Sequence, residues 1–257
     1  SSGLRVNSAK DDAAGLAIAE RMTAQIRGFD VAARNANDGI SLLQVADGAL
    51  GKIGDNLQRM RELGVQAKNG TLNDTDRANL NREYTELANE VGRVATGTTF
   101  NGNNVFEAAN KTVDLQIGSG NVASDTLSVN LTDTGTAAGN DLQTTLGGAT
   151  QAAIVTAFGG VDTVANATTA ITEIDTAIND ITNLRATTGA GLSRLDQVVS
   201  SLETTSANLS SARGRIMDAD FAKETANLTR AQILQQAGTA MLAQANQLPN
   251  NVLSLLR

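Results

Sequence analysis

Residues 230–257 read RAQILQQAGTAMLAQANQLPNNVLSLLR, with no charged residue between the two terminal arginines. Apolar residues recur there in steps of three and four, which predicts an α-helix with a continuous apolar face. That face consists of Leu234, Ala237, Met241, Ala245, Leu248, Val252 and Leu255. The other faces carry Gln and Asn, whose unpaired amides would be costly in hydrocarbon, so this helix is not a bilayer span. We therefore expect other protein to enclose it, and its place at the chain end points to other copies of the same chain.

Residues 8–68 read as one very long helix. Asn7 or Ser8 is expected to cap it, with the carboxylates of Asp11 and Asp12 in the first turns, where they favour the helix dipole. Steps of three and four are a coiled-coil pattern, and at 1.5 Å per residue this helix would be about 90 Å long. The apolar seam comprises Met22, Ile26, Phe29, Ala33, Ala36, Ile40 and Leu43, shifts by one residue near Ala46, and continues through Leu50, Ile53, Leu57 and Met60.

A short turn follows this first helix. Asn69 and Gly70 predict a stop in the left-handed conformation. Asn73 then begins a second helix that runs to about Val94. Because the connection is short, we expect the two helices to form an antiparallel pair.

The middle of the chain has a different character. Residues 100–104 form a turn cluster, and the alternating apolar residues of 111–117 and 126–131 predict a β-hairpin around Gly118-Ser119-Gly120-Asn121. Residues 132–165 are rich in Thr, Gly, Ala and Asn, and we expect a loop there with a short helix near 150–158.

Helical periodicity returns at about Ala165 and resumes in phase after Gly189 and Gly191, so one long helix is expected, with a break near residues 213–215. The predicted fold is therefore mainly α: a long coiled-coil helical bundle that forms a rod, with a small β-hairpin insert. The two ends of the chain would pack on each other, and the middle would project.

Composition excludes several classes of function. The net charge of −7 offers no basic stripe for nucleic acid. The absence of His and Cys removes the commonest general base, zinc ligand and nucleophilic thiol, and aromatic residues make up only 2% of the chain, so we expect no enzyme, cofactor or metal site. The carboxylates of Asp11-Asp12, Asp74 and Asp76, and Asp218 and Asp220 are better explained as helix-start electrostatics and caps than as catalytic or metal-binding groups.

Four segments closely resemble bacterial flagellin, the subunit of the flagellar filament. They are SSGLRVNSAKDDAAG (1–15), LQRMRELGVQ (57–66), TFNGNNVF (99–106) and residues 211–257. The resemblance extends over about 1–106 and 165–257. It implies that residues 1–106 form the N-terminal helices of the rod domain, D1, with a spoke segment at 1–12. Residues 107–164 would be a short variable β-rich insert, 165–213 the C-terminal D1 helix, and 214–257 a second spoke and the helix of the inner tube, D0.

The chain departs from the family pattern in two respects. The segment of roughly thirty residues that precedes Ser1 in the family is missing from this sequence, which implies that the final helix lacks its usual partner. The insert is also short, so large outer domains are not expected.

The resemblance also implies partners and contact residues. The inner-tube helix would use Leu234, Met241, Leu248, Val252 and Leu255. Arg59, Leu63 and Glu83 fall where flagellins contact an innate immune receptor and pack between subunits. Further expected partners are an export chaperone at the C-terminal helix and other flagellin subunits in an extracellular filament for motility. The alternatives are a flagellin-like surface protein that binds a ligand such as a polysaccharide through its insert, or a hook–filament junction protein.

Overall fold

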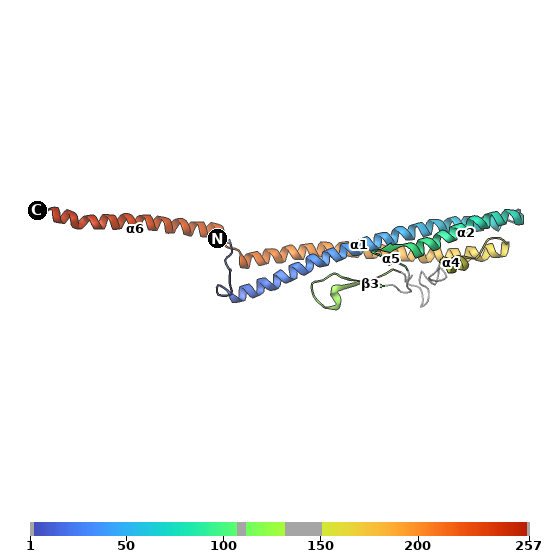
Figure 1. Cartoon of the computed structure of the whole chain (residues 1–257), viewed down its shortest axis with the longest axis horizontal. Coiled ribbons are helices and arrows are strands. Elements are labelled where there is room, and N and C mark those ends of the chain that lie inside the picture. Colours follow the sequence, from blue (N-terminus) through green and yellow to red (C-terminus); the bar gives the residue numbers. More distant parts are fainter. Residues whose placement is uncertain (1–2, 107–111, 132–150, 256–257) are drawn as a thin grey trace. The chain divides into compact units, whose positions relative to one another are not determined.

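The computed structural model describes residues 3–106, 112–131 and 151–255, with side chains described up to residue 245 except for that of residue 151 (Figure 1). The chain divides into two compact units, one of residues Gln25–Ser206 and one of residues Ser1–Ala24 with Ala207–Arg257. The fold is mainly helical, and the described residues add two small antiparallel sheets. The predicted fold class is therefore confirmed.

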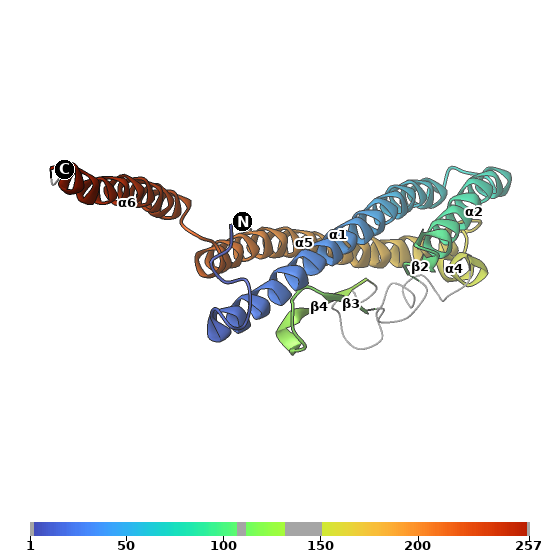
Figure 2. The same cartoon turned by 60° about the vertical axis from the view of Figure 1, so that its left-hand side comes forward.

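The larger unit is built on three long helices that lie side by side in Figures 1 and 2: α1 (Ala13–Ala67), α2 (Asp74–Gly97) and α5 (Val164–Met217). Their facing seams form a continuous apolar core that buries six of the predicted seam residues of α1, whereas Met22, Ile26, Phe29, Ala33 and Ile40 are only partly buried. The six buried residues are Ala36, Leu43, Leu50, Ile53, Leu57 and Met60. α5 contributes Ile174, Ile181, Leu184 and Leu195. Two ion pairs, Arg61–Asp175 and Arg185–Asp47, also join α1 and α5.

The predicted shift of the α1 seam near Ala46 was wrong. Ala46 is fully buried, and the seam keeps its spacing because Gly39 occupies the buried position while Ile40 lies at its edge. A Cβ at Gly39 would collide with the side chain of Leu115, so glycine leaves the room into which this residue of the hairpin packs.

The start of α1 also differs from the prediction. Neither Asn7 nor Ser8 caps the helix, which begins at Ala13. Asp11 Oδ2 instead accepts bonds from the backbone N–H groups of Asn7 and Ser8, at 3.2 and 2.9 Å, and so closes a separate turn. Asp12 Oδ1 accepts from Gly15 N at 2.8 Å, which places the cap at Asp12.

The end of α1 is set by a side chain from the next helix. Among the described residues, positive φ angles occur at Gly3, Asn101, Gly102 and Gly159, so the left-handed stop predicted at Asn69-Gly70 is absent. Arg77 of α2 instead donates from Nε to Ala67 O at 3.1 Å and from Nη2 to Asn69 O at 3.3 Å. These bonds satisfy carbonyls that the helix leaves without a partner, and Arg77 is nearly buried in making them.

α2 begins as predicted. Asn73 Oδ1 accepts from Asp76 N at 2.8 Å, and Asp76 Oδ2 accepts from Asn73 N at 3.4 Å, which completes a capping box. After α2, β1 (Thr99–Phe100) and β2 (Asn103–Asn104) pair in a small hairpin. Asn101 and Gly102 form its turn with φ angles of 49° and 78°, as a tight hairpin requires.

The β-hairpin predicted in the insert is confirmed. β3 (Thr112–Gln116) pairs antiparallel with β4 (Thr126–Asn130), with Val113 opposite Val129 and a 3₁₀ turn, η1 (Ala123–Asp125), before β4. The hairpin buries Leu127, Val129 and Leu131 in the core shared with α1 and α5. A Cβ at Gly191 of α5 would come within 3.1 Å of Leu43 Cδ1, so the glycine that seemed to interrupt α5 makes room for this side chain of α1.

The short helix predicted near residues 150–158 is α4 (Gln151–Phe158), which packs on α2. Tyr84 donates its hydroxyl to Phe158 O at 2.9 Å, and Asn81 Oδ1 accepts from Val161 N at 2.7 Å. These two bonds attach the chain to α2 just before α5 begins. Most of the predicted loop, 132–150, lies outside the described residues.

The smaller unit contains the start of α1, the end of α5 and the final helix, α6 (Phe221–Leu255). Near the start of the chain, Leu4 pairs with Asp218 in an antiparallel bridge, and Val6 is buried. α5 runs without interruption through Gly189 and Gly191, as predicted, but it ends at Met217 rather than near residues 213–215.

Candidate functional surfaces

A cluster of ion pairs joins α1 and α2 at the positions singled out for contact with other molecules. Arg59 donates to Glu83 Oε1 from Nε at 3.0 Å and from Nη2 at 2.8 Å, and its Nη1 lies 2.8 Å from Glu62 Oε2. The carboxylates of Glu62 and then Glu83 raise the pKa of Arg59. The side chains of Arg59 and Glu83 are 51% and 48% exposed, so both are available to a partner.

Leu63 lies elsewhere. Its exposed fraction is 1%, because its position on α1 faces the core beside Met60 and Ala67. This burial counts against Leu63 as a side chain that touches another molecule. Arg61 points toward α5 and pairs with Asp175 at 2.6 Å, so it belongs to a different face from Arg59.

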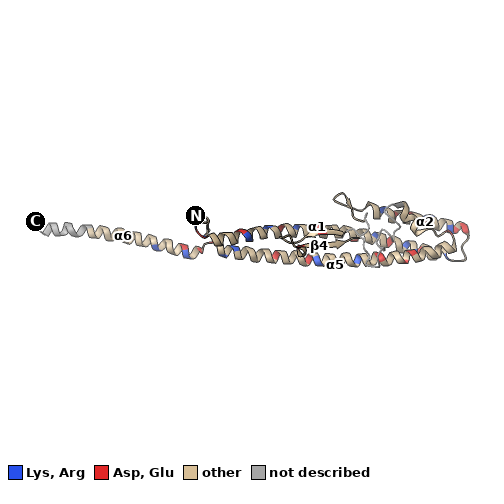
Figure 3. Ribbon diagram, turned by 90° about the horizontal axis from the view of Figure 1, so that it is seen from below, with Lys and Arg blue, Asp and Glu red and all other residues tan. Residues whose placement is uncertain are grey.

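The final helix exposes apolar side chains along its described length. Leu234, Met241 and Leu242 are 64%, 71% and 65% exposed, and Phe221, Leu228 and Ile233 are exposed as well. Figure 3 shows charged residues only near the start of α6, and the last of these is Arg230. The predicted residues Leu248, Val252 and Leu255 lie beyond the described side chains. Exposed apolar area of this kind marks a surface that another protein covers.

The carboxylates considered as catalytic or metal-binding candidates have structural roles. Asp11 and Asp12 organise the turn and the start of α1, and the bonds from Ser8 and Asn7 lower the pKa of Asp11. Asp220 Oδ1 accepts from Ala222 N and Lys223 N at 3.0 and 3.2 Å and so caps α6. Within the described residues, no group of three or more His, Cys, Asp or Glu side chains could hold a metal ion.

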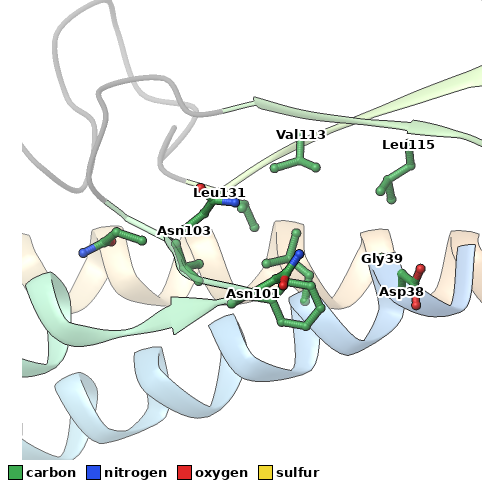
Figure 4. A pocket seen from close by; sticks show the side chains of 11 residues that line it. Asp38, Gly39, Asn101, Asn103, Val113, Leu115 and Leu131 are labelled. Carbon is green, nitrogen blue, oxygen red and sulfur yellow. The ribbon is translucent and has the colours of Figure 1, made fainter. Parts of the chain in front are cut away.

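A cavity of about 390 Å³ lies between α1 and the two hairpins (Figure 4). Its lining is mainly apolar and includes Val113, Leu115 and Leu131 on one side and Gly39 of α1 on the other, where Leu115 packs against this glycine. Asp38, Asn101 and Asn103 add polar groups at its edge. Among the described residues that line it, Asp38 is the one titratable group, so the cavity lacks the nucleophile and base that acyl or glycosyl transfer would need.

The insert offers little for stacking against a sugar. Phe158 is the one aromatic residue in residues 107–165 of the sequence, and it is 1% exposed in the core. The structure therefore gives no support to the alternative of a polysaccharide-binding insert. It also describes no helix long and apolar enough to cross a membrane within the ranges that it covers.

Sequence reasoning missed two arginines that have structural roles. Arg77 caps α1 from α2, and Arg5 binds the end of α5 through Ile216 O at 2.8 Å. In each case the arginine is in a different segment from the helix that it caps, so no local spacing signals the contact. The general preference for a cation near a helix C-terminus would have identified both only once the fold was known.

Comparison with known proteins gives the same assignment from both ends of the chain. Residues 1–111 match the bacterial flagellin N-terminal helical region, and residues 171–256 match the bacterial flagellin C-terminal helical region. A flagellin of Halalkalibacterium halodurans is 44% identical over 259 residues, covering 100% of this chain and 89% of that protein. A flagellin of Bacillus subtilis is 41% identical over 284 residues, covering 100% and 90%. The crystal structure of Bacillus cereus flagellin superposes with a TM-score of 0.53 at 35% identity, covering 70% of this chain and 94% of that one.

Proposed function

The chain belongs to the bacterial flagellin family and is a structural subunit of the extracellular flagellar filament, and from that premise we propose which of its surfaces join the subunits. The family is structural rather than enzymatic, so contacts between copies carry the function in motility. We assign α1, α2 and α5 to the rod domain and α6 to the inner tube of the filament.

The exposed apolar surface of α6 is the observation that carries this proposal. Leu234, Met241 and Leu242 are each more than three-fifths exposed in the single chain. Burying a side chain of this size contributes about 1.5–3 kcal/mol, so a row of them provides a strong drive for association. The Gln and Asn residues beside them can pair with amides of neighbouring copies without introducing charge.

Substitution of Met241 by Glu tests the role of α6. A carboxylate at that position would have to be buried in the tube, and we expect Met241→Glu to abolish filaments. The matched control is Val122→Glu on the hairpin loop, where an apolar residue that is 61% exposed becomes the same acid. Electron microscopy of cells that produce each variant as their sole flagellin gives the readout. Normal filaments from Met241→Glu would exclude α6 from the tube.

We propose a second contact surface formed by Arg59 and Glu83. Their pairing holds two half-exposed charged groups in a fixed arrangement on neighbouring helices. Exposed pairs of this kind contribute little to the stability of the fold because solvent screens their charges, so they can be replaced without unfolding it. Inter-subunit packing in the filament is the role that we favour, and contact with an innate immune receptor on the free subunit would use the same side chains.

The two roles of this surface can be separated. We expect Arg59→Ala and Glu83→Ala to weaken lateral packing, measured as the temperature at which filaments dissociate. Binding of the monomeric variants to the ectodomain of the receptor tests the second role. Arg93→Ala is the matched control, because Arg93 forms an equally exposed pair with Glu90 on α2. If Arg59→Ala and Glu83→Ala match Arg93→Ala in both the dissociation temperature and receptor binding, this surface has no role in contacts.

Before assembly, α6 would need a partner of another kind. We propose that an export chaperone covers Leu234, Met241 and neighbouring residues in the monomer. This follows from the same exposed apolar surface, which would otherwise promote premature association. Met241→Glu would then weaken chaperone binding as well as assembly, which isothermal titration with the purified chaperone would detect.

A further inference from the structure

The chain contains two Asn-Gly pairs, and the fold holds them in different ways. Asn69-Gly70 lies in the turn between α1 and α2, and Asn101-Gly102 forms the turn between β1 and β2. In any Asn-Gly pair the backbone nitrogen of the glycine can attack the side-chain amide carbon, because glycine has no side chain to obstruct that approach. The surrounding structure therefore decides which of the two asparagines is a site of chemical modification.

The turn at Asn69 leaves the attacking nitrogen free and activates the group that it attacks. Thr71 N donates to Asn69 Oδ1 at 3.2 Å and Leu72 N donates to Asn69 O at 3.3 Å, so the side chain of Asn69 folds back over a hydrogen-bonded turn. Among the hydrogen bonds of the described residues, none uses the N–H of Gly70, and a Cβ there would meet nothing within 4 Å. The bond from Thr71 polarises the amide carbonyl and would stabilise the oxyanion that forms on attack.

Arg77 favours the other half of the same reaction. Gly70 N becomes nucleophilic when it loses its proton, and the negative charge is then shared by resonance with Asn69 O, the carbonyl oxygen of the same peptide group. Arg77 Nη2 lies 3.3 Å from that oxygen, and the arginine is nearly buried, so solvent screens its charge little. Asp74, which pairs with Arg77 at 3.3 Å, is fully exposed and therefore opposes this effect only weakly.

Asn101 is held in a conformation that resists the reaction. Asn101 and Gly102 have φ angles of 49° and 78°, and the strands on either side of them pair with Phe100 opposite Asn103. Bonding of Gly102 N to Asn101 Cγ requires rotation of this backbone, which the pairing of β1 with β2 opposes. The side chain of Asn101 also accepts no hydrogen bond from the residues that the structure describes, so its amide is not activated.

We propose that Asn69 is a self-modification site, at which the folded chain promotes loss of its own side-chain amide. Gly70 N gives its proton to hydroxide and bonds to Asn69 Cγ. The bond from Cγ to Nδ2 then breaks, and the nitrogen leaves as ammonia with a proton from water, which regenerates hydroxide. The resulting succinimide adds one water at either carbonyl and opens to aspartate or isoaspartate. Either product places a carboxylate in the turn near Arg77, and isoaspartate lengthens the main chain there by one carbon.

Peptide mapping by mass spectrometry of the full chain measures the reaction at both pairs, and an isoaspartyl methyltransferase assay identifies the isoaspartate product. The purified monomer is incubated at neutral pH either folded or in concentrated urea. Asn69 and Asn101 should react at similar rates in urea, because both precede glycine. In the folded chain Asn69 should react at least as fast as in urea, whereas Asn101 should react several-fold more slowly.

Three variants test the roles assigned to the neighbours of Asn69. Gly70→Ala adds a Cβ in open space, so it should slow the reaction several-fold without lowering the melting temperature. Arg77→Met removes the guanidinium and should also slow it, whereas Arg82→Met, exposed on the same helix, should not. The rate at Asn101 reports unfolding in each variant, and if Arg77→Met raises it, the comparison of folded and unfolded parent chain decides.

Three results would overturn the proposal. The first is a rate at Asn69 that is several-fold lower in the folded parent chain than in urea. The second is a folded-state rate at Asn69 no higher than that at Asn101. The third is an unchanged rate at Asn69 in Arg77→Met while Asn101 stays protected.

Discussion

Substitution of Tyr84 by phenylalanine is a sensitive test of the core, because the chain contains a single tyrosine and no tryptophan. Tyr84 is fully buried on α2, and its hydroxyl donates to Phe158 O, whose residue is itself buried. Tyr84→Phe keeps the ring but leaves that carbonyl without a donor. An orphaned buried acceptor costs about 1–3 kcal/mol. At 2–4 °C per kcal/mol for a chain of this size, the melting temperature should fall by about 2–12 °C.

Alkaline pH provides a second measurement on the same residue. Burial, and then the nearby carboxylate of Glu173, raise the pKa of Tyr84 above its ordinary value of 10. The folded state therefore keeps its proton where the unfolded state loses it, so this contribution to stability is complete below pH 10 and is lost as the pH rises toward the folded-state pKa. Tyr84→Phe should remove this contribution, so its free energy of unfolding should fall less steeply with pH above 10 than that of the parent chain.

Two spectroscopic signals separate these expectations from a trivial loss of structure. Absorbance at 295 nm follows ionisation of the tyrosine, and ellipticity at 222 nm follows the helices. We expect the two to change together in the parent chain, because Tyr84 ionises only when α2 and α4 separate. Ser201→Ala, which removes an exposed hydroxyl from α5, should leave both curves unchanged. Ionisation near pH 10 with full ellipticity, together with an unchanged melting temperature in Tyr84→Phe, would refute the buried hydrogen bond.

Two further predictions concern helix ends and glycines. Arg77→Met keeps an apolar stem but removes the bonds to the end of α1, and should lower the free energy of unfolding in urea by about 1.5–3 kcal/mol, whereas exposed Arg82→Met should change it little. Gly48→Ala on α1 meets nothing within 4 Å and should stabilise the chain by about 0.5–1 kcal/mol. Gly28→Ala places its Cβ 2.6 Å from Ser119 Cβ and should instead displace the hairpin loop, seen as faster amide exchange in β3 and β4.

The elements most fully predicted from the sequence are those set by local patterns. Leu50, Ile53 and Leu57 are spaced so that they share one face in an α-helix. All three are fully buried where that face packs against the neighbouring helices. The capping box at Asn73 and Asp76 lies within four residues, so it can be recognised without knowledge of the tertiary structure. The alternation in β3 and β4 likewise fixes the register, because a slip of one residue would expose the buried face.

The candidate contact surfaces were predicted less completely, for a physical reason. A motif specifies which residues are present, but the face of α1 that points outward depends on where α2 and α5 pack. Arg59 and Glu83 meet across two helices and remain half exposed, whereas Leu63, four residues after Arg59, is in the core. The sequence indicated the exposed surface of α6 best, because the absence of charged residues can be read directly from the sequence without knowing how the helices pack.

The ends of the long helices show why the remaining errors arose. Local sequence placed a glycine stop after α1 and a break near residues 213–215, and both placements were wrong. In the structure each helix ends where an arginine from another segment takes its last carbonyls: Arg77 at α1, and Arg5 at α5 across 211 residues of sequence. A guanidinium suits that position, since it offers several donors and a charge that complements the helix dipole. The ends of these helices are therefore set partly by contacts with distant segments of the chain, and not by their local sequence alone.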